Sequence, residues 1–355
     1  MNTLPEQLPE EPEGSRARED MESPVADPLP PESWAGKPGE PIEVLPPDQA
    51  APETAITDAA ATLLGSGGTV DEPEFLASYR RQTFVRPVRI PHLGHLSLFL
   101  LILCFGWLGA GSLLLLGLHF HLFGISTLKN AINDFRYTLG SQAIQYFFSI
   151  AGCLIVFPLI WRKGFFEGLQ WCGATALKFK WRLISVAVFC FFAAMLNGVL
   201  LPGPTDAPID RIFRAPGAAW VLFGFGVTLA PFFEELAFRG FLLPALCTAY
   251  DWLVEQLTGA PMRPVDEDGH PQWSLPAMAV ASVVTSLPFA LMHGEQTSYS
   301  LGPFLLLIFI SLVLCWTRLK THSLASSMIV HACYNFLLFS FMLLGTGGFK
   351  HLEKM

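Results

Sequence analysis

The sequence predicts an all-α protein, a polytopic bundle of about seven transmembrane helices with a disordered tail before it. The chain of 355 residues is 52% hydrophobic and only 15% charged, with a mean hydropathy of +0.43, which is too apolar for a soluble protein of this size. Its apolar residues lie in long runs. Its acidic residues concentrate in the first 69 positions, so the formal net charge of −8 arises mainly in one terminal segment.

The apolar runs have the length that a bilayer requires. A helix needs about 20 apolar residues to cross the hydrocarbon core, and it satisfies its own backbone hydrogen bonds there. Pro231 lies near the middle of the fourth run and lacks a backbone donor, so that run is expected to be one bent span or two shorter pieces. The predicted spans are residues 96–118, 142–161, 183–201, 218–246, 275–292, 299–316 and 324–344.

The rest of the chain divides by composition and charge. Residues 1–70 are rich in Pro, Glu and Asp and contain no apolar run, which predicts a disordered acidic tail. Residues 71–95 form a basic juxtamembrane segment, and residues 96–345 form the transmembrane domain. Cytoplasmic loops keep an excess of Lys and Arg, which places the N-terminus in the cytoplasm, and the short loops favour a bacterial plasma membrane. The arginines before the first span are Arg80, Arg81, Arg86 and Arg89.

Three ionisable residues interrupt the fourth span. Glu234, Glu235 and Arg239 occur within an otherwise apolar stretch, and ionisable residues inside a membrane are functional candidates. Glu235 and Arg239 are four residues apart, on one helical face, with the acid first as an ion pair prefers. Glu234 is turned about 100° away and keeps a less fully paired carboxylate, which suits a general base. The alternative is a structural ion-pair cluster that holds helices together.

Two later spans carry polar residues at helical spacing. Phe289 and His293 end the fifth span, and His331 and Asn335 lie within the seventh. A histidine at a membrane boundary is often only interfacial, and a His/Asn pair can serve merely as an interhelical clasp. Because three helices each place such groups in apolar surroundings, we expect them to meet around a hydrated pocket. A Glu base, two histidines and an amide donor are the parts needed to hydrolyse a peptide bond.

The order of these motifs resembles a known family. Glu-Glu-x-x-x-Arg, then Phe-x-x-x-His, then His-x-x-x-Asn on successive spans is similar to the CPBP family of type II CAAX prenyl endopeptidases and bacteriocin-processing or immunity proteins. The resemblance covers a core of about residues 218–344. It implies an intramembrane endopeptidase acting on membrane-associated or prenylated proteins. The implied roles are water activation by Glu234 assisted by His293, organisation of the site by Glu235, Arg239 and Phe289, and oxyanion stabilisation by His331 and Asn335.

The cofactor expectation favours a reaction without metal. The sequence has no HExxH pair, which would place two zinc ligands and a base on one helix. If the reaction were metal-dependent, Glu234, His293 and His331 would be the Zn²⁺ ligands. The seven cysteines are scattered without a CxxC pair and predict neither a disulfide framework nor a thiolate metal site.

Two other functional classes compete with a protease. A non-catalytic scaffold or a bacteriocin-immunity-type protein would use the polar cluster only as structure. A small-solute transporter would use the same residues as a proton relay, but the sequence lacks the internal repeat that such folds usually show. The expected partners are a protein or peptide substrate at the membrane and the lipid bilayer, and no nucleic acid.

Overall fold

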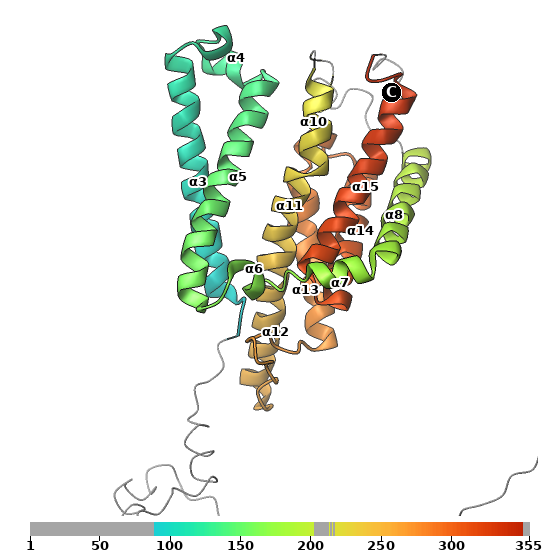
Figure 1. The fold of residues 1–355 in the computed structure, drawn as a ribbon. Coiled ribbons are helices and arrows are strands. Elements are labelled where there is room, and N and C mark those ends of the chain that lie inside the picture. The colour runs from blue at the N-terminus through green and yellow to red at the C-terminus, as the bar shows by residue number, and fades with distance from the viewer. Residues whose placement is uncertain (1–88, 202–212, 214, 216, 351–355) are drawn as a thin grey trace, which may run out of the picture. The chain divides into compact units, whose positions relative to one another are not determined.

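The computed structural model describes residues 89–201, 213, 215 and 217–350. Within these residues, seven helices are long and apolar enough to cross a membrane, and the β-structure is limited to one isolated bridge between Val265 and Pro271. The predicted all-α transmembrane fold is therefore confirmed (Figure 1). The predictions for residues 1–70 and for most of residues 71–95 fall outside the described part, and the domain boundaries remain predictions.

The helices match the predicted spans closely at most of their ends. Short connecting helices lie between them, namely η2 (Leu122–Gly124), α4 (Leu128–Ile132), α6 (Phe165–Gly168), α7 (Gly173–Lys178) and η4 (Glu295–Thr297). The long elements are α3 (Leu93–His119), α5 (Phe135–Trp161), α8 (Lys180–Leu200), the composite of α10 (Ala218–Val227), α11 (Leu229–Glu235), η3 (Leu236–Leu242) and α12 (Leu243–Thr258), then α13 (Leu275–Met292), α14 (Leu301–Thr321) and α15 (Leu324–Gly345).

The composite helix is irregular where the ionisable residues lie. Its first break is at Thr228, whose φ of −117° and ψ of −74° separate α10 from α11. Pro231 follows three residues later, and its missing donor leaves the carbonyl of Val227 without the usual helical bond. The segment Leu236–Leu242 is then π-helical, a form that is rare and occurs often at functional sites.

The same helix continues farther than the sequence suggests. The composition of residues 250–273 predicts an irregular loop, but α12 remains helical to Thr258. The polar residues that resemble a loop instead bind neighbouring elements. Asp251 accepts hydrogen bonds from the backbone N of Ser274 at 2.9 Å and from its hydroxyl at 2.5 Å. Glu255 pairs with Arg89 at 2.8 Å. These tertiary contacts outweigh the local loop signal.

Hydrogen bonds between loops define one end of the bundle. Leu324 N donates to Gln170 O at 3.0 Å, Ile90 N donates to Gly269 O at 3.0 Å, and Lys163 donates to Asp268 O at 2.7 Å. The loops after α5 and α12 and the loop before α15 therefore lie together, beside the start of α3. Basic residues are frequent at this end of the bundle. The cytoplasmic orientation of this end remains a prediction. The basic residues include Arg89, Arg162, Lys163, Lys178, Lys180, Arg182, Arg263 and Lys320.

Aromatic packing holds α11 against the first two spans. The Phe99 ring of α3 stacks on Phe241 with centroids 4.3 Å apart. Tyr146 of α5 stacks on Phe233 at 3.8 Å. Both contacts belong to one buried cluster, and such pairs contribute about 0.5–1.5 kcal/mol beyond area burial. Phe233 precedes Glu234 directly, so this packing fixes the backbone that carries the first carboxylate.

Candidate active site

Three polar side chains from three helices meet inside the bundle. Glu234 of α11 is 9% exposed, and its Oε1 lies 3.9 Å from Nε2 of His293, the residue that caps the end of α13. Its Oε2 lies 3.7 Å from Nε2 of His331 on α15. Both separations exceed a direct hydrogen bond, and a water that bridges either pair would have to lie beside the line that joins the two atoms. The structure thus brings together three of the four residues expected to meet.

The second carboxylate holds its partners through one oxygen, Oε1, while its Oε2 is buried without a hydrogen-bond partner among the described residues. Arg239 Nη1 donates to Glu235 Oε1 at 3.0 Å, and both side chains are completely buried. Arg239 Nη2 donates to the carbonyl of Ser311 at 3.0 Å and to its hydroxyl at 2.7 Å. The guanidinium carbon also lies 4.6 Å from the centroid of the Phe289 ring, a favourable cation–π position. Sequence reasoning missed Ser311, because nothing local distinguishes its hydroxyl.

The histidines present the same ring nitrogen to Glu234. His293 Nδ1 lies 2.9 Å from the carbonyl of Phe289, and a carbonyl can only accept, so Nδ1 carries the proton. His331 Nδ1 lies 2.9 Å from Glu235 Oε1, and an ionised carboxylate likewise only accepts. In their neutral forms, both rings therefore turn an unprotonated Nε2 toward Glu234. The space between the three residues is lined by hydrogen-bond acceptors.

Asn335 is placed differently from the other three. Its Nδ2 donates to the carbonyl of Gly226 at 2.8 Å, which ties α15 to α10 just before the break at Thr228. In the part of the chain that the structure describes, no hydrogen bond joins its side chain to Glu234, His293 or His331. One N–H of the amide remains beyond the bond to Gly226, since an amide nitrogen carries two donors.

Comparison with known families was informative for this region. Residues 216–337 match the family model described as Rce1-like, type II CAAX prenyl endopeptidase. The chain contains an Rce1-like domain. This agrees with the CPBP resemblance, and the seven residues of the three sequence motifs fall within the match. No curated protein and no solved structure matches the chain. Together with seven apolar helices, the Rce1-like domain identifies a multi-pass membrane protein and supports a CAAX-type protease activity in general.

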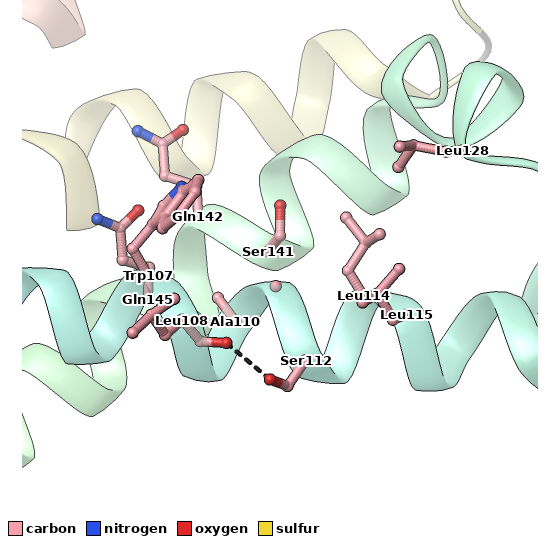
Figure 2. A pocket seen from close by; sticks show the side chains of 11 residues that line it. Trp107, Leu108, Ala110, Ser112, Leu114, Leu115, Leu128, Ser141, Gln142 and Gln145 are labelled. Carbon is pink, nitrogen blue, oxygen red and sulfur yellow. Dashed lines mark hydrogen bonds between the residues drawn. The ribbon is translucent and has the colours of Figure 1, made fainter.

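A large groove lies beside the Rce1-like domain, between α3 and α5. It has a volume of about 550 Å³ and is lined by apolar residues of α3 together with Ser141, Gln142 and Gln145 of α5 (Figure 2). Gln142 also donates to the hydroxyl of Tyr146 at 2.9 Å, and Tyr146 stacks on Phe233. The groove is therefore linked to the backbone of Glu234 only through the stacked rings of Tyr146 and Phe233. None of the polar residues of the Rce1-like domain lines it.

The separations between Glu234 and the two histidines differ from those of a tetrahedral zinc site. Two imidazole nitrogens and a carboxylate are suitable ligands, but ligands at about 2.1 Å in a tetrahedral site lie about 3.4 Å from one another. The separations of 3.7 and 3.9 Å are wider. Over the described residues, no three His, Cys, Asp or Glu side chains surround a common point closely enough to hold a metal ion. The groups as placed do not fit zinc, and the chemistry below uses the side chains alone.

Proposed function

We propose that the protein is an intramembrane endopeptidase that cleaves a membrane-associated or prenylated substrate with water activated by Glu234. One observation carries this proposal. Glu234 lies 3.9 and 3.7 Å from the Nε2 atoms of two histidines, beyond direct hydrogen bonds, so the three groups can share a water that lies beside them. A water molecule supplies the two donors that this acceptor-lined space lacks. The alternative, a scaffold with a structural cluster, gives no reason for these acceptors to face one another.

The proposed reaction proceeds by general-base catalysis. The Glu234 carboxylate takes a proton from water while the hydroxide oxygen forms a bond to the scissile carbonyl carbon. The carbonyl electron pair moves to its oxygen, which becomes an oxyanion. The intermediate collapses with cleavage of the C–N bond, and the proton held by Glu234 passes to the leaving nitrogen. The products are a carboxyl group and an amine, and the carboxylate is regenerated.

The surrounding residues are assigned supporting roles. His293 holds the water on the side opposite His331. Glu235 fixes the His331 ring through Nδ1, and Arg239 holds Glu235 in place. The free N–H of Asn335 is the candidate donor for the oxyanion. Removal of one such donor in other hydrolases lowers the rate by about 10²–10³.

The decisive variant is Glu234→Gln, which keeps the side-chain shape and removes the base. Purified protein in nanodiscs would be given a farnesylated peptide and its unlipidated twin, with mass spectrometry of the products. We expect loss of cleavage for this variant and normal cleavage for the matched control Glu295→Gln, which neutralises an exposed carboxylate two residues after His293. Preserved cleavage in Glu234→Gln would exclude Glu234 as the base, and failure of the wild-type protein to cleave either peptide would favour the scaffold.

Two further measurements define the chemistry. A single turnover in H₂¹⁸O should place the label in the new C-terminal carboxyl group and leave Glu234 unlabelled, because water and not the carboxylate attacks. Label in Glu234 would indicate a covalent acyl-enzyme. Dialysis against a chelator should leave the rate unchanged. Loss of activity that zinc restores would assign Glu234, His293 and His331 as metal ligands and overturn the metal-free mechanism.

A further inference from the structure

A second groove lies at the basic end of the bundle, between the start of α8 and the end of α14. It has a volume of about 230 Å³. Two cations, Arg182 and Lys320, line its mouth, and Leu183, Val186 and Trp316 line the rest. It shares no residue with the site built around Glu234. The inference drawn from it does not depend on the proposed protease activity.

In the part of the chain that the structure describes, no acidic side chain pairs with the two cations of this groove. Arg182 and Lys320 are both exposed, and neither belongs to an ion pair among the described residues. The sequence contains no acidic residue in positions 168–201 or 296–350, the two stretches that form the groove. The Arg182 guanidinium instead lies 5.5 Å from the centroid of the Phe179 ring. The groove therefore has two free cationic heads above an apolar wall.

The aromatic residues at this end match a membrane interface. Trp181 is 73% exposed and Trp316 is 57% exposed, and tryptophan is enriched at the level of lipid head groups. Leu183 is buried one residue after Arg182, and Val186 lies one helical turn deeper. The surface thus changes from cationic to apolar within a single turn of α8.

We propose that this groove binds an anionic phospholipid. Its phosphate would lie between Arg182 and Lys320, and one acyl chain would follow Val186 and Trp316 into the hydrocarbon layer. Charge complementarity favours an anion, since basic pockets between transmembrane helices bind anionic head groups. The apolar wall favours an occupant with a chain over a free phosphate. An acidic peptide would leave its polar backbone against that wall without hydrogen-bond partners.

The test measures retained lipid on the full chain by native mass spectrometry. Protein is released from nanodiscs of phosphatidylcholine with a minor fraction of phosphatidylglycerol. Each basic residue near an anionic surface contributes about fivefold to binding, so Arg182→Gln with Lys320→Gln should weaken phosphatidylglycerol retention about 25-fold. The matched control is Lys178→Gln with Lys180→Gln, which removes the same charge from exposed positions at the same end that do not line the groove. The control should retain phosphatidylglycerol more strongly than the groove variant does.

Several outcomes would overturn the proposal. Equal loss in both double variants would indicate a diffuse surface attraction, and no loss in either would place the lipid elsewhere. Retention of phosphatidylcholine as strongly as phosphatidylglycerol would remove the role of charge. Displacement of the lipid by glycerol phosphate alone would show an anion site that needs no acyl chain. The charge-preserving variant Arg182→Lys with Lys320→Arg should retain the lipid, which separates a charge effect from a folding defect.

Discussion

Arg239→Met should be among the most damaging single substitutions in the bundle. The guanidinium is completely buried and makes three hydrogen bonds, one to Glu235 and two to Ser311. Methionine has a similar length but no charge, so the variant leaves the Glu235 carboxylate buried without its cation. Removing one partner of a buried pair costs about 3–5 kcal/mol. Lysine at this position should cost less, because it keeps the charge but loses the planar fork.

A double variant gives a sharper test than the loss of stability in Arg239→Met alone, because the prediction concerns the direction of a change in the free energy of unfolding. Glu235→Gln with Arg239→Met removes both charges, and the side-chain amide oxygen that replaces the carboxylate can still accept from His331. Replacement of a whole buried pair is often close to neutral, so the double variant should be more stable than Arg239→Met alone. Independent effects would instead add. The double variant is either more stable or less stable than Arg239→Met, so the test does not depend on the accuracy of the estimated free energies.

Reversible unfolding in mixed micelles, followed at a fixed mole fraction of SDS, measures these free energies. Arg136→Met is the matched control, because Arg136 pairs with Asp134 at 2.6 Å but is 41% exposed. Exposed pairs contribute about 0–1 kcal/mol, so this control should unfold nearly as the wild type does. A double variant that is less stable than Arg239→Met would refute the claim that the uncompensated Glu235 carboxylate causes most of the stability loss in Arg239→Met.

Three further predictions concern other parts of the protein. Ser311→Ala removes one hydroxyl acceptor from the buried arginine and should lower the free energy of unfolding by about 1–2 kcal/mol in the same micelle assay. Asn335→Asp removes the N–H donors of the side chain. If the amide stabilises the oxyanion, kcat should fall about 10²–10³-fold with little change in KM. If the amide serves only in the structural bond to Gly226, the variant should show a lower Tm and no such loss of kcat. Burial lowers the pKa of His270, whose Nδ1 lies 3.1 Å from the carbonyl of Ile90. The unfolded chain therefore binds more protons, so the His270 contribution is present above about pH 6.5 and is lost as the pH falls below it; the drop in Tm on acidification should shrink in His270→Gln.

The transmembrane fold and the central ion pair could be predicted from local rules. Hydropathy and length define the spans, because the bilayer sets both. The Glu235–Arg239 pair follows from helical spacing alone, and the structure contains it. Glu234 is set apart by the same spacing. These features need no knowledge of how the helices pack, which is why they are accessible from sequence.

The partners that complete the site depend on tertiary packing and were not predictable. A hydroxyl in an apolar helix usually bonds a carbonyl of its own helix, as Ser112 does with Leu108 and Ser286 does with Ser282. Ser311 instead accepts from Arg239, a residue 72 positions earlier. Its sequence surroundings do not distinguish the two cases. The partner of Asn335 is equally remote, since Gly226 is 109 positions away.

The adjacent carboxylates have different sets of partners. Neighbouring residues on a helix point about 100° apart, so one arginine a turn away can neutralise only one of them. Glu235 takes that arginine and also the Nδ1–H of His331. Glu234 meets two Nε2 atoms whose own donors are directed elsewhere, and an acceptor facing acceptors is unfavourable in a low-dielectric interior. A proton shared within the cluster, or a bound molecule that brings its own hydrogens or positive charge, would relieve this arrangement. In the proposed mechanism that molecule is water, and the proton that it loses goes to the carboxylate of Glu234.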